Sequence, residues 1–158
     1  MNQLMVQQDK LIWAAEPKSY LSAAMTAKYI SMKNYARLVI VIMTGAWAAG
    51  TAAVTLTQAT AIAGTGAKTL PFDKQWNDVT TSGTLVETAV VANTFNLATA
   101  LKMHVIEVDA ASLDVAGGFD CVTLAVASPG ANADFYAVAY ILTGGRYQEA
   151  TPPSAIVD

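Results

Sequence analysis

Charged residues are scarce in this chain of 158 residues, which has 9 Lys and Arg and 12 Asp and Glu. It also has one cysteine, Cys121, and one histidine, His104. A lone cysteine excludes an intramolecular disulfide and a multi-cysteine metal site. A lone histidine leaves His104 as the only base for a Ser–His–Asp arrangement, and no Gly-x-Ser-x-Gly elbow accompanies it. The sequence therefore predicts no enzyme. We expect Cys121 to be a buried structural thiol, and His104 to be either a packing residue or a residue that makes a hydrogen bond at the rim of the fold.

The remaining patterns for a chemical site are weak. Residues 64–69 (GTGAKT) resemble a phosphate loop, but Ala67 separates Gly66 from Lys68, where the motif requires adjacent Gly and Lys. Acidic side chains gather in the second half of the chain, without the spacing of an EF-hand. They are Glu107, Asp109, Asp114 and Asp120. We expect a solvated acidic rim there, with loop-bound calcium as the alternative, and no catalytic residue, cofactor or metal.

Low charge also leaves a surface made largely of Ala, Thr, Ser, Asn and Gly. Such a neutral surface keeps copies apart poorly and suits a protein that works in an assembly. Basic residues predominate before residue 78 and acidic residues after it. This asymmetry is either chance or a pair of complementary patches that meet between subunits. Neither half is basic enough to indicate a nucleic-acid partner.

What the chain has in quantity is β-forming sequence, centred on residues 35–60. An apolar, β-branched run (YARLVIVIM) precedes a loop with two glycines and Trp47, and an alternating segment (AAVTLTQAT) follows. We interpret this stretch as a long β-hairpin. Residues 38–67 carry no charge, yet the dense apolar run is far shorter than the ~20 residues of a transmembrane helix. We therefore expect no membrane span.

Similar strand patterns continue along the chain. Residues 122–127 and 135–142 alternate around a Pro-Gly turn and predict a second hairpin. About six to eight short strands with Gly, Pro and Asn turns predict an all-β fold, an antiparallel two-sheet β-sandwich or jelly roll. We expect an N-terminal arm (residues 1–18), the sandwich (19–147) and an extended C-terminal tail (148–158).

Apolar residues in the N-terminal arm are the first candidates for assembly contacts. Leu4 and Leu11 have a spacing that would permit a short helix, and Pro17 closes the segment. A tryptophan and several aliphatic residues would be wasted in a frayed terminus, so we expect the arm to order against the body or a neighbouring subunit. Trp47 is either an exposed contact anchor or a plug over one end of the sandwich. The candidate contacts are Leu4, Leu11, Ile12, Trp13 and Trp47.

Several strings have a characteristic pattern: residues 29–35 (YISMKNY) and the apolar run that follows, 54–59 (VTLTQA), 64–70 (GTGAKTL), 108–115 (VDAASLDV), 118–120 (GFD) and 145–147 (GRY). Through these strings the chain resembles, across residues 20–147, small virion proteins of tailed bacteriophages, of the capsid decoration or cement type. The resemblance implies a β-rich homo-oligomer, plausibly a trimer, without catalytic residues. It implies the phage major capsid protein as partner and the capsid surface of the virion as location, after synthesis in the bacterial cytoplasm. A tail, neck or fibre component is the alternative, and a carbohydrate- or calcium-binding sandwich is another.

Overall fold

Strands make up nearly all of the regular structure. The computed structural model describes residues 5–78, 83–98, 100, 102–145 and 155–156. One α-helical turn and two 3-10 turns, η1 (Ala110–Ser112) and η2 (Val115–Gly117), accompany the strands. The other elements, in chain order, are α1 (Met5–Gln8), β1 (Lys10–Ser19), β2 (Met25–Thr26), β3 (Ile30–Ser31), β4 (Tyr35–Thr44), β5 (Ala52–Ala59), β6 (Lys68–Thr69), β7 (Lys74–Asp78), β8 (Leu85–Ala89), β9 (Phe95–Leu97), β10 (Met103–Asp109), β11 (Cys121–Val126) and β12 (Phe135–Gly145).

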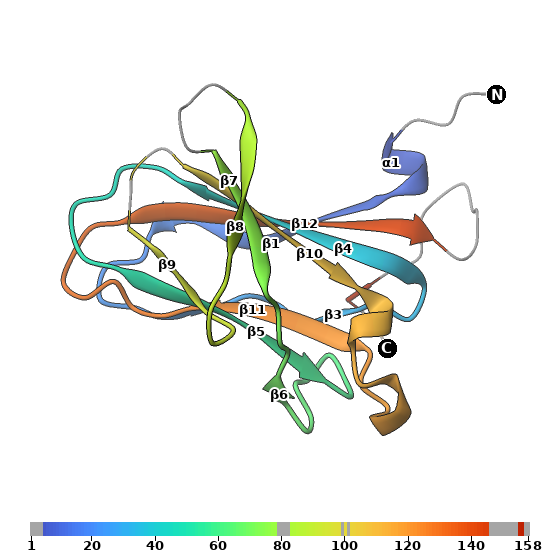
Figure 1. The fold of residues 1–158 in the computed structure, drawn as a ribbon. Helices are drawn as coiled ribbons and strands as arrows, with labels where there is room; N and C mark the ends of the chain where they lie inside the picture. Colours follow the sequence, from blue (N-terminus) through green and yellow to red (C-terminus); the bar gives the residue numbers. More distant parts are fainter. Residues whose placement is uncertain (1–4, 79–82, 99, 101, 146–154, 157–158) are drawn as a thin grey trace.

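These strands form two packed antiparallel sheets, which confirms the predicted all-β sandwich (Figure 1). Sheet A has the strand order β1-β12-β4-β10-β7-β8. Sheet B has the order β2-β11-β5-β6, with β3 also pairing with β11 and β9 with β5. Strands β5 and β10, and β4 from Leu38 onward, alternate between buried and more exposed residues, because successive side chains point to opposite faces. In the central strands β11 and β12, most residues are buried. The two inward faces meet to form the core.

The core is aliphatic with a few tyrosines. In sheet A, Leu38, Ile40 and Ile42 of β4 are fully buried, and sheet B supplies Leu124 and Val126 of β11 opposite them. Burying such side chains stabilises the fold by roughly 1.5–3 kcal/mol each. Cys121 is 0% exposed, as expected for a structural thiol. His104 is 7% exposed, which fits the packing alternative and not a position at the rim.

Neither predicted hairpin forms, although the strands themselves do. β4 pairs with β10 and β12 in sheet A, whereas β5 pairs with β11, β6 and β9 in sheet B. The second pattern divides in the same way, with β11 in sheet B and β12 in sheet A. Links 45–51 and 127–134 are long enough to cross the ~10 Å between packed sheets. The two strands of each predicted hairpin, β4 with β5 and β11 with β12, therefore lie in different sheets on opposite sides of the core. The hairpin prediction was wrong in both cases.

The two crossing links pack against each other at one end of the sandwich. Gly45 N–H donates to the Phe135 carbonyl at 2.7 Å, and Phe135 N–H donates to the Ala46 carbonyl at 2.9 Å. Asp134, which is 0% exposed, accepts a hydrogen bond from Ala48 N–H through Oδ1. These contacts hold the two crossing links against each other at this end of the sandwich.

The N-terminal segment is part of the sheet. β1 pairs antiparallel with β12, from Lys10 opposite Leu142 to Ser19 opposite Phe135, so residues 10–19 order against the body as an edge strand. The short helix that the spacing permitted is confined to Met5–Gln8. Most of the C-terminal tail lies outside the described residues. Within it, Ala155 is buried and its carbonyl accepts a hydrogen bond from Ser31 N–H at 2.7 Å.

Candidate assembly surface

The predicted contact residues do not form one patch. On β1, Leu11 and Trp13 point outward and are 55% and 51% exposed, whereas Ile12 points inward and packs against the core. Trp47 is half-buried against the core, and its Nε1–H donates to the Gly50 carbonyl at 3.1 Å. This placement fits the plug alternative for Trp47. Leu4 lies outside the described residues.

Leu11 and Trp13 belong to a larger apolar surface that the sequence reasoning missed. Residues directly opposite each other in a sheet point to the same face. One such row crosses all six strands of sheet A, and every member except the last is apolar. The row runs Trp13, Ala139, Val41, Val105, Trp76 and Glu87.

Neighbouring rows have the same character. Leu11 lies opposite Ile141 and then Val39, and Ala137 lies opposite Met43 and then Met103. We call these apolar positions the outer face of sheet A. Its members are Leu11, Trp13, Val39, Val41, Met43, Trp76, Met103, Val105, Ala137, Ala139 and Ile141. Sheet B packs against the opposite face of sheet A (Figure 1). On the outer face, Leu11, Trp13 and Met43 are 55%, 51% and 41% exposed, whereas Ala137 and Ala139 are buried.

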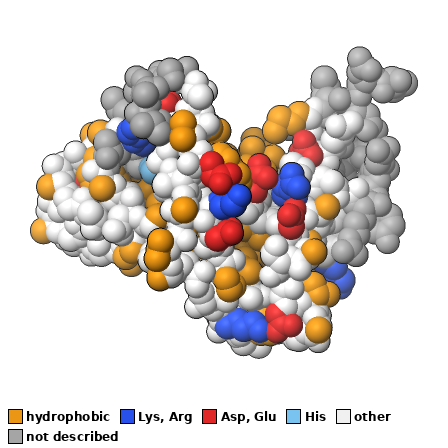
Figure 2. Space-filling model, viewed as in Figure 1, with side chains coloured by type: hydrophobic (Ala, Val, Ile, Leu, Met, Phe, Trp, Pro, Cys, Tyr) orange, Lys and Arg blue, Asp and Glu red, His pale blue; other side chains and the backbone are white. Residues whose placement is uncertain are grey.

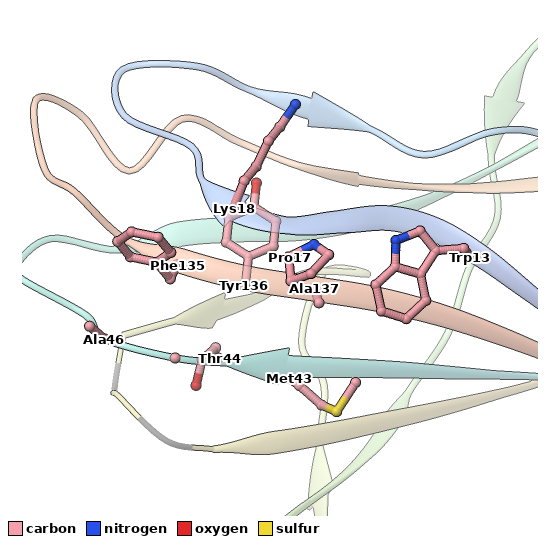
Figure 3. Close-up of a pocket in the computed structure, with 10 residues that line it drawn as sticks. Trp13, Pro17, Lys18, Met43, Thr44, Ala46, Phe135, Tyr136 and Ala137 are labelled. Carbon is pink, nitrogen blue, oxygen red and sulfur yellow. The ribbon is translucent and has the colours of Figure 1, made fainter.

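At one end of this face the surface is hollowed into a groove of about 570 Å³. Figure 3 shows Trp13 and Phe135 toward opposite ends of the groove, with Pro17 between them and Met43 from β4 below. Phe135 is 44% exposed. The lining is mostly apolar, so the groove suits hydrophobic side chains of a partner better than a charged ligand.

Ion pairs lie at the other end of the same face. Arg37 Nε donates to Asp109 Oδ1 at 3.0 Å, and Arg37 also lies 3.6 Å from Glu107. Lys74 lies 3.2 Å from Glu87 across the β7–β8 pair. Figure 2 shows acidic and basic side chains beside hydrophobic ones near the centre of the view. Exposed pairs of this kind add little stability, but they give the apolar surface a polar rim.

The acidic residues that raised the calcium alternative are divided among separate contacts. Glu107 and Asp109 pair with Arg37, whereas Asp114 pairs with Lys68 and accepts from Gly117 N–H. The Lys68 hydrogen bond and the Gly117 N–H hold the pKa of Asp114 below its usual range. Asp120 accepts from the Cys121 thiol at 3.2 Å. Across the described residues, no group of three His, Cys, Asp or Glu side chains could hold a metal ion.

His104 faces the core. Its Nδ1 lies 3.0 Å from Gln75 Oε1, and its ring lies 5.4 Å from that of Phe95. Burial, with a contribution from Lys102, lowers the pKa of His104 to about 4. The ring is therefore neutral at physiological pH and contributes packing and one hydrogen bond.

Comparison with known proteins adds no relative to this picture. No protein-family model matches the chain, and no curated protein matches it. Within the described part of the chain, every helix falls short of the length and apolar character needed to cross a bilayer. The outer face of sheet A therefore stands as the candidate functional surface on its geometry alone.

Proposed function

We propose that the protein is a structural component of a tailed-phage virion that binds the outside of the assembled head as a homo-oligomer and reinforces it. The observation that carries this proposal is the outer face of sheet A, an apolar face with a polar rim. An exposed apolar patch larger than a few hundred Å² marks an interaction surface in most soluble proteins. The resemblance of residues 20–147 to decoration proteins supplies the kind of partner, the major capsid protein.

The mechanism follows from the shape of the molecule. A sandwich with a closely packed core acts as a rigid spacer, because its sheets do not deform easily. Outer-face contacts from each copy then bridge neighbouring capsomers. Linked copies bind together through multivalency, so individually weak contacts combine into stable attachment. No catalytic step is part of this proposal.

The test replaces two exposed outer-face residues. We expect Leu11→Ser with Trp13→Ser to weaken binding to empty heads of the parent phage at least tenfold in a co-sedimentation assay, because an aromatic and an aliphatic anchor are lost. Val115→Ser is the control, since Val115 is 65% exposed but lies on η2 and is not part of the outer face of sheet A. Equal binding by both variants would contradict the proposal.

Two other outcomes separate the alternative functions. Electron microscopy of particles carrying labelled protein should show label on the head; label on the tail or neck would indicate a tail component. A glycan array and calorimetric titration with calcium should show no binding. A specific sugar or calcium signal abolished by Trp13→Ser would favour the binding-module alternative, because Trp13 lines the groove.

A further inference from the structure

The two edge strands of sheet A differ in how well they are protected. An edge strand exposes unpaired backbone groups, and proteins guard against unwanted pairing with bulges, proline and lysine. β1 has all three. Its register with β12 is broken between Trp13 and Ala15 and again between Ala15 and Lys18, and it contains Pro17 and a lysine near each end.

β8, at the opposite edge, has none of these protections. It pairs with β7 through five consecutive residues without a break, from Leu85 opposite Asp78 to Ala89 opposite Lys74. It contains neither proline nor lysine, and all five of its side chains are exposed. Among the described strands, β7 is its only partner.

One hydrogen bond next to β8 shows which of its backbone N–H and C=O groups point toward β7 and which point toward the unpaired edge. Val90 N–H donates to the Asp73 carbonyl at 2.7 Å, on the β7 side. Along an antiparallel strand, the N–H and C=O of alternate residues point to opposite edges. Val86 and Thr88 therefore direct their backbone toward β7. Leu85, Glu87 and Ala89 direct theirs toward the open edge.

We propose that β8 pairs antiparallel with β8 of a second copy, which joins two copies of sheet A into one continuous sheet. A two-fold axis perpendicular to the sheet pairs identical strands antiparallel and covers the open edge of both copies at once. This inference rests on the homo-oligomer in the proposed function and names the element that makes it. It leaves the outer faces of both copies on the same side of the joined sheet.

The side chains of β8 disfavour one register, and we place the two-fold axis at Val86. A two-fold axis at Glu87 would place two carboxylates opposite each other, which is destabilising. An axis at Val86 places Leu85 opposite Glu87 on each side and brings the two Val86 side chains together. Because the Val86 backbone points toward β7, that central pair is not hydrogen-bonded, and its Cα atoms would lie ~4.5 Å apart. Each Glu87 keeps its Lys74 partner at 3.2 Å.

The first test is Glu87→Pro in the full-length protein, with Glu87→Ala as the matched control. Both variants lose the carboxylate, but only proline removes the N–H at the open edge, and the β7 pairing does not use that group. By analytical ultracentrifugation we expect the wild type and Glu87→Ala to associate, and Glu87→Pro to associate at least tenfold more weakly with an unchanged circular dichroism spectrum. Unchanged association of a folded Glu87→Pro variant would overturn the proposal.

A second test does not depend on tolerance of proline. Mild oxidation should give a disulfide-linked dimer of Val86→Cys, because a non-hydrogen-bonded pair lies within disulfide reach. Val91→Cys is the control, since Val91 is 79% exposed but lies beyond β8. The native Cys121 is fully buried. No Val86→Cys dimer, or equal dimer in both variants, would overturn the pairing.

These outcomes can be separated from failure of the proposed function. A trimer that survives Glu87→Pro and still binds empty heads would leave the proposed function intact and remove the β8 contact. A β8 dimer that binds no head would support this contact and contradict the capsid role.

Discussion

At the scale of single residues, the single histidine of the protein has a structural role. His104 shares its strand face with Ile106 and Val108, and all three are buried. Alternation along residues 103–109 places these three side chains on one face of the strand, but it does not say which face is buried. It did not predict the Gln75 partner, which comes from a different strand and satisfies a polar ring inside an apolar core.

The lowered pKa of His104 makes a prediction about acid stability. Neutral His104 favours the folded state fully above the unfolded pKa of about 6.5, and this contribution is lost as pH falls toward 4. The difference corresponds to about 3 kcal/mol at most. His104→Asn keeps a polar partner for Gln75 but cannot titrate. In urea unfolding, the wild type should lose up to about 3 kcal/mol more than His104→Asn between pH 7 and pH 4.

The carboxylates also titrate between pH 7 and pH 4, but the wild type and His104→Asn share them, so their contributions to the loss of stability cancel in this comparison. Equal losses of stability in the wild type and His104→Asn would show that His104 takes up its proton equally well in the folded chain.

At the scale of elements, the two crossing links behave as one unit. Gly50 has a φ of +85°, and a Cβ there would lie 2.8 Å from the Pro129 carbonyl oxygen. The close approach of the links thus requires glycine both for its conformation and for its lack of a side chain. This requirement explains the glycine in a loop that the sequence reasoning assigned to a hairpin turn.

Gly50→Ala should therefore cost more stability than the same change at an uncrowded site. Gly118 is the control, because its φ is +79° but a Cβ there meets nothing within 4 Å. We expect a loss of about 1 kcal/mol for Gly118→Ala, from backbone strain alone, and about 2 kcal/mol or more for Gly50→Ala. Denaturant unfolding gives both values. A smaller loss at Gly50 would mean that the links do not pack this closely.

At the scale of the whole molecule, a buried hydroxyl ties the two sheets together. Tyr140 of β12 is 0% exposed, and its Oη accepts a hydrogen bond from Leu124 N–H of β11 at 3.0 Å. The bond joins sheet A to sheet B inside an apolar core. Burial raises the pKa of Tyr140 above its ordinary value, so the hydroxyl stays protonated.

Tyr140→Phe should destabilise the sandwich by about 1–3 kcal/mol, because it leaves the Leu124 N–H buried without an acceptor. Tyr136→Phe is the matched control on the same strand. The Tyr136 hydroxyl is buried and has no hydrogen-bond partner among the described residues, so its removal should change stability by less than ~0.5 kcal/mol. Thermal or urea unfolding measures both. Equal effects of the two substitutions would contradict the inter-sheet role of Tyr140.

The amino-acid sequence alone determined the class of fold and the inward faces of the main strands. Alternation is local, since each side chain's direction depends only on its neighbours in the strand. A signal for the outer face was also present, because the run from Leu38 to Met43 is apolar on both faces. Only the tertiary structure decided which strands pair. It therefore decided that β4 lies in sheet A and β5 in sheet B, on opposite sides of the core. It also gathered Trp13, Val41 and Trp76 into one row and placed β8 at the edge of sheet A, with β7 as its partner among the described strands. Pairing joins segments far apart in the chain, and alternation carries no information about the partner strand.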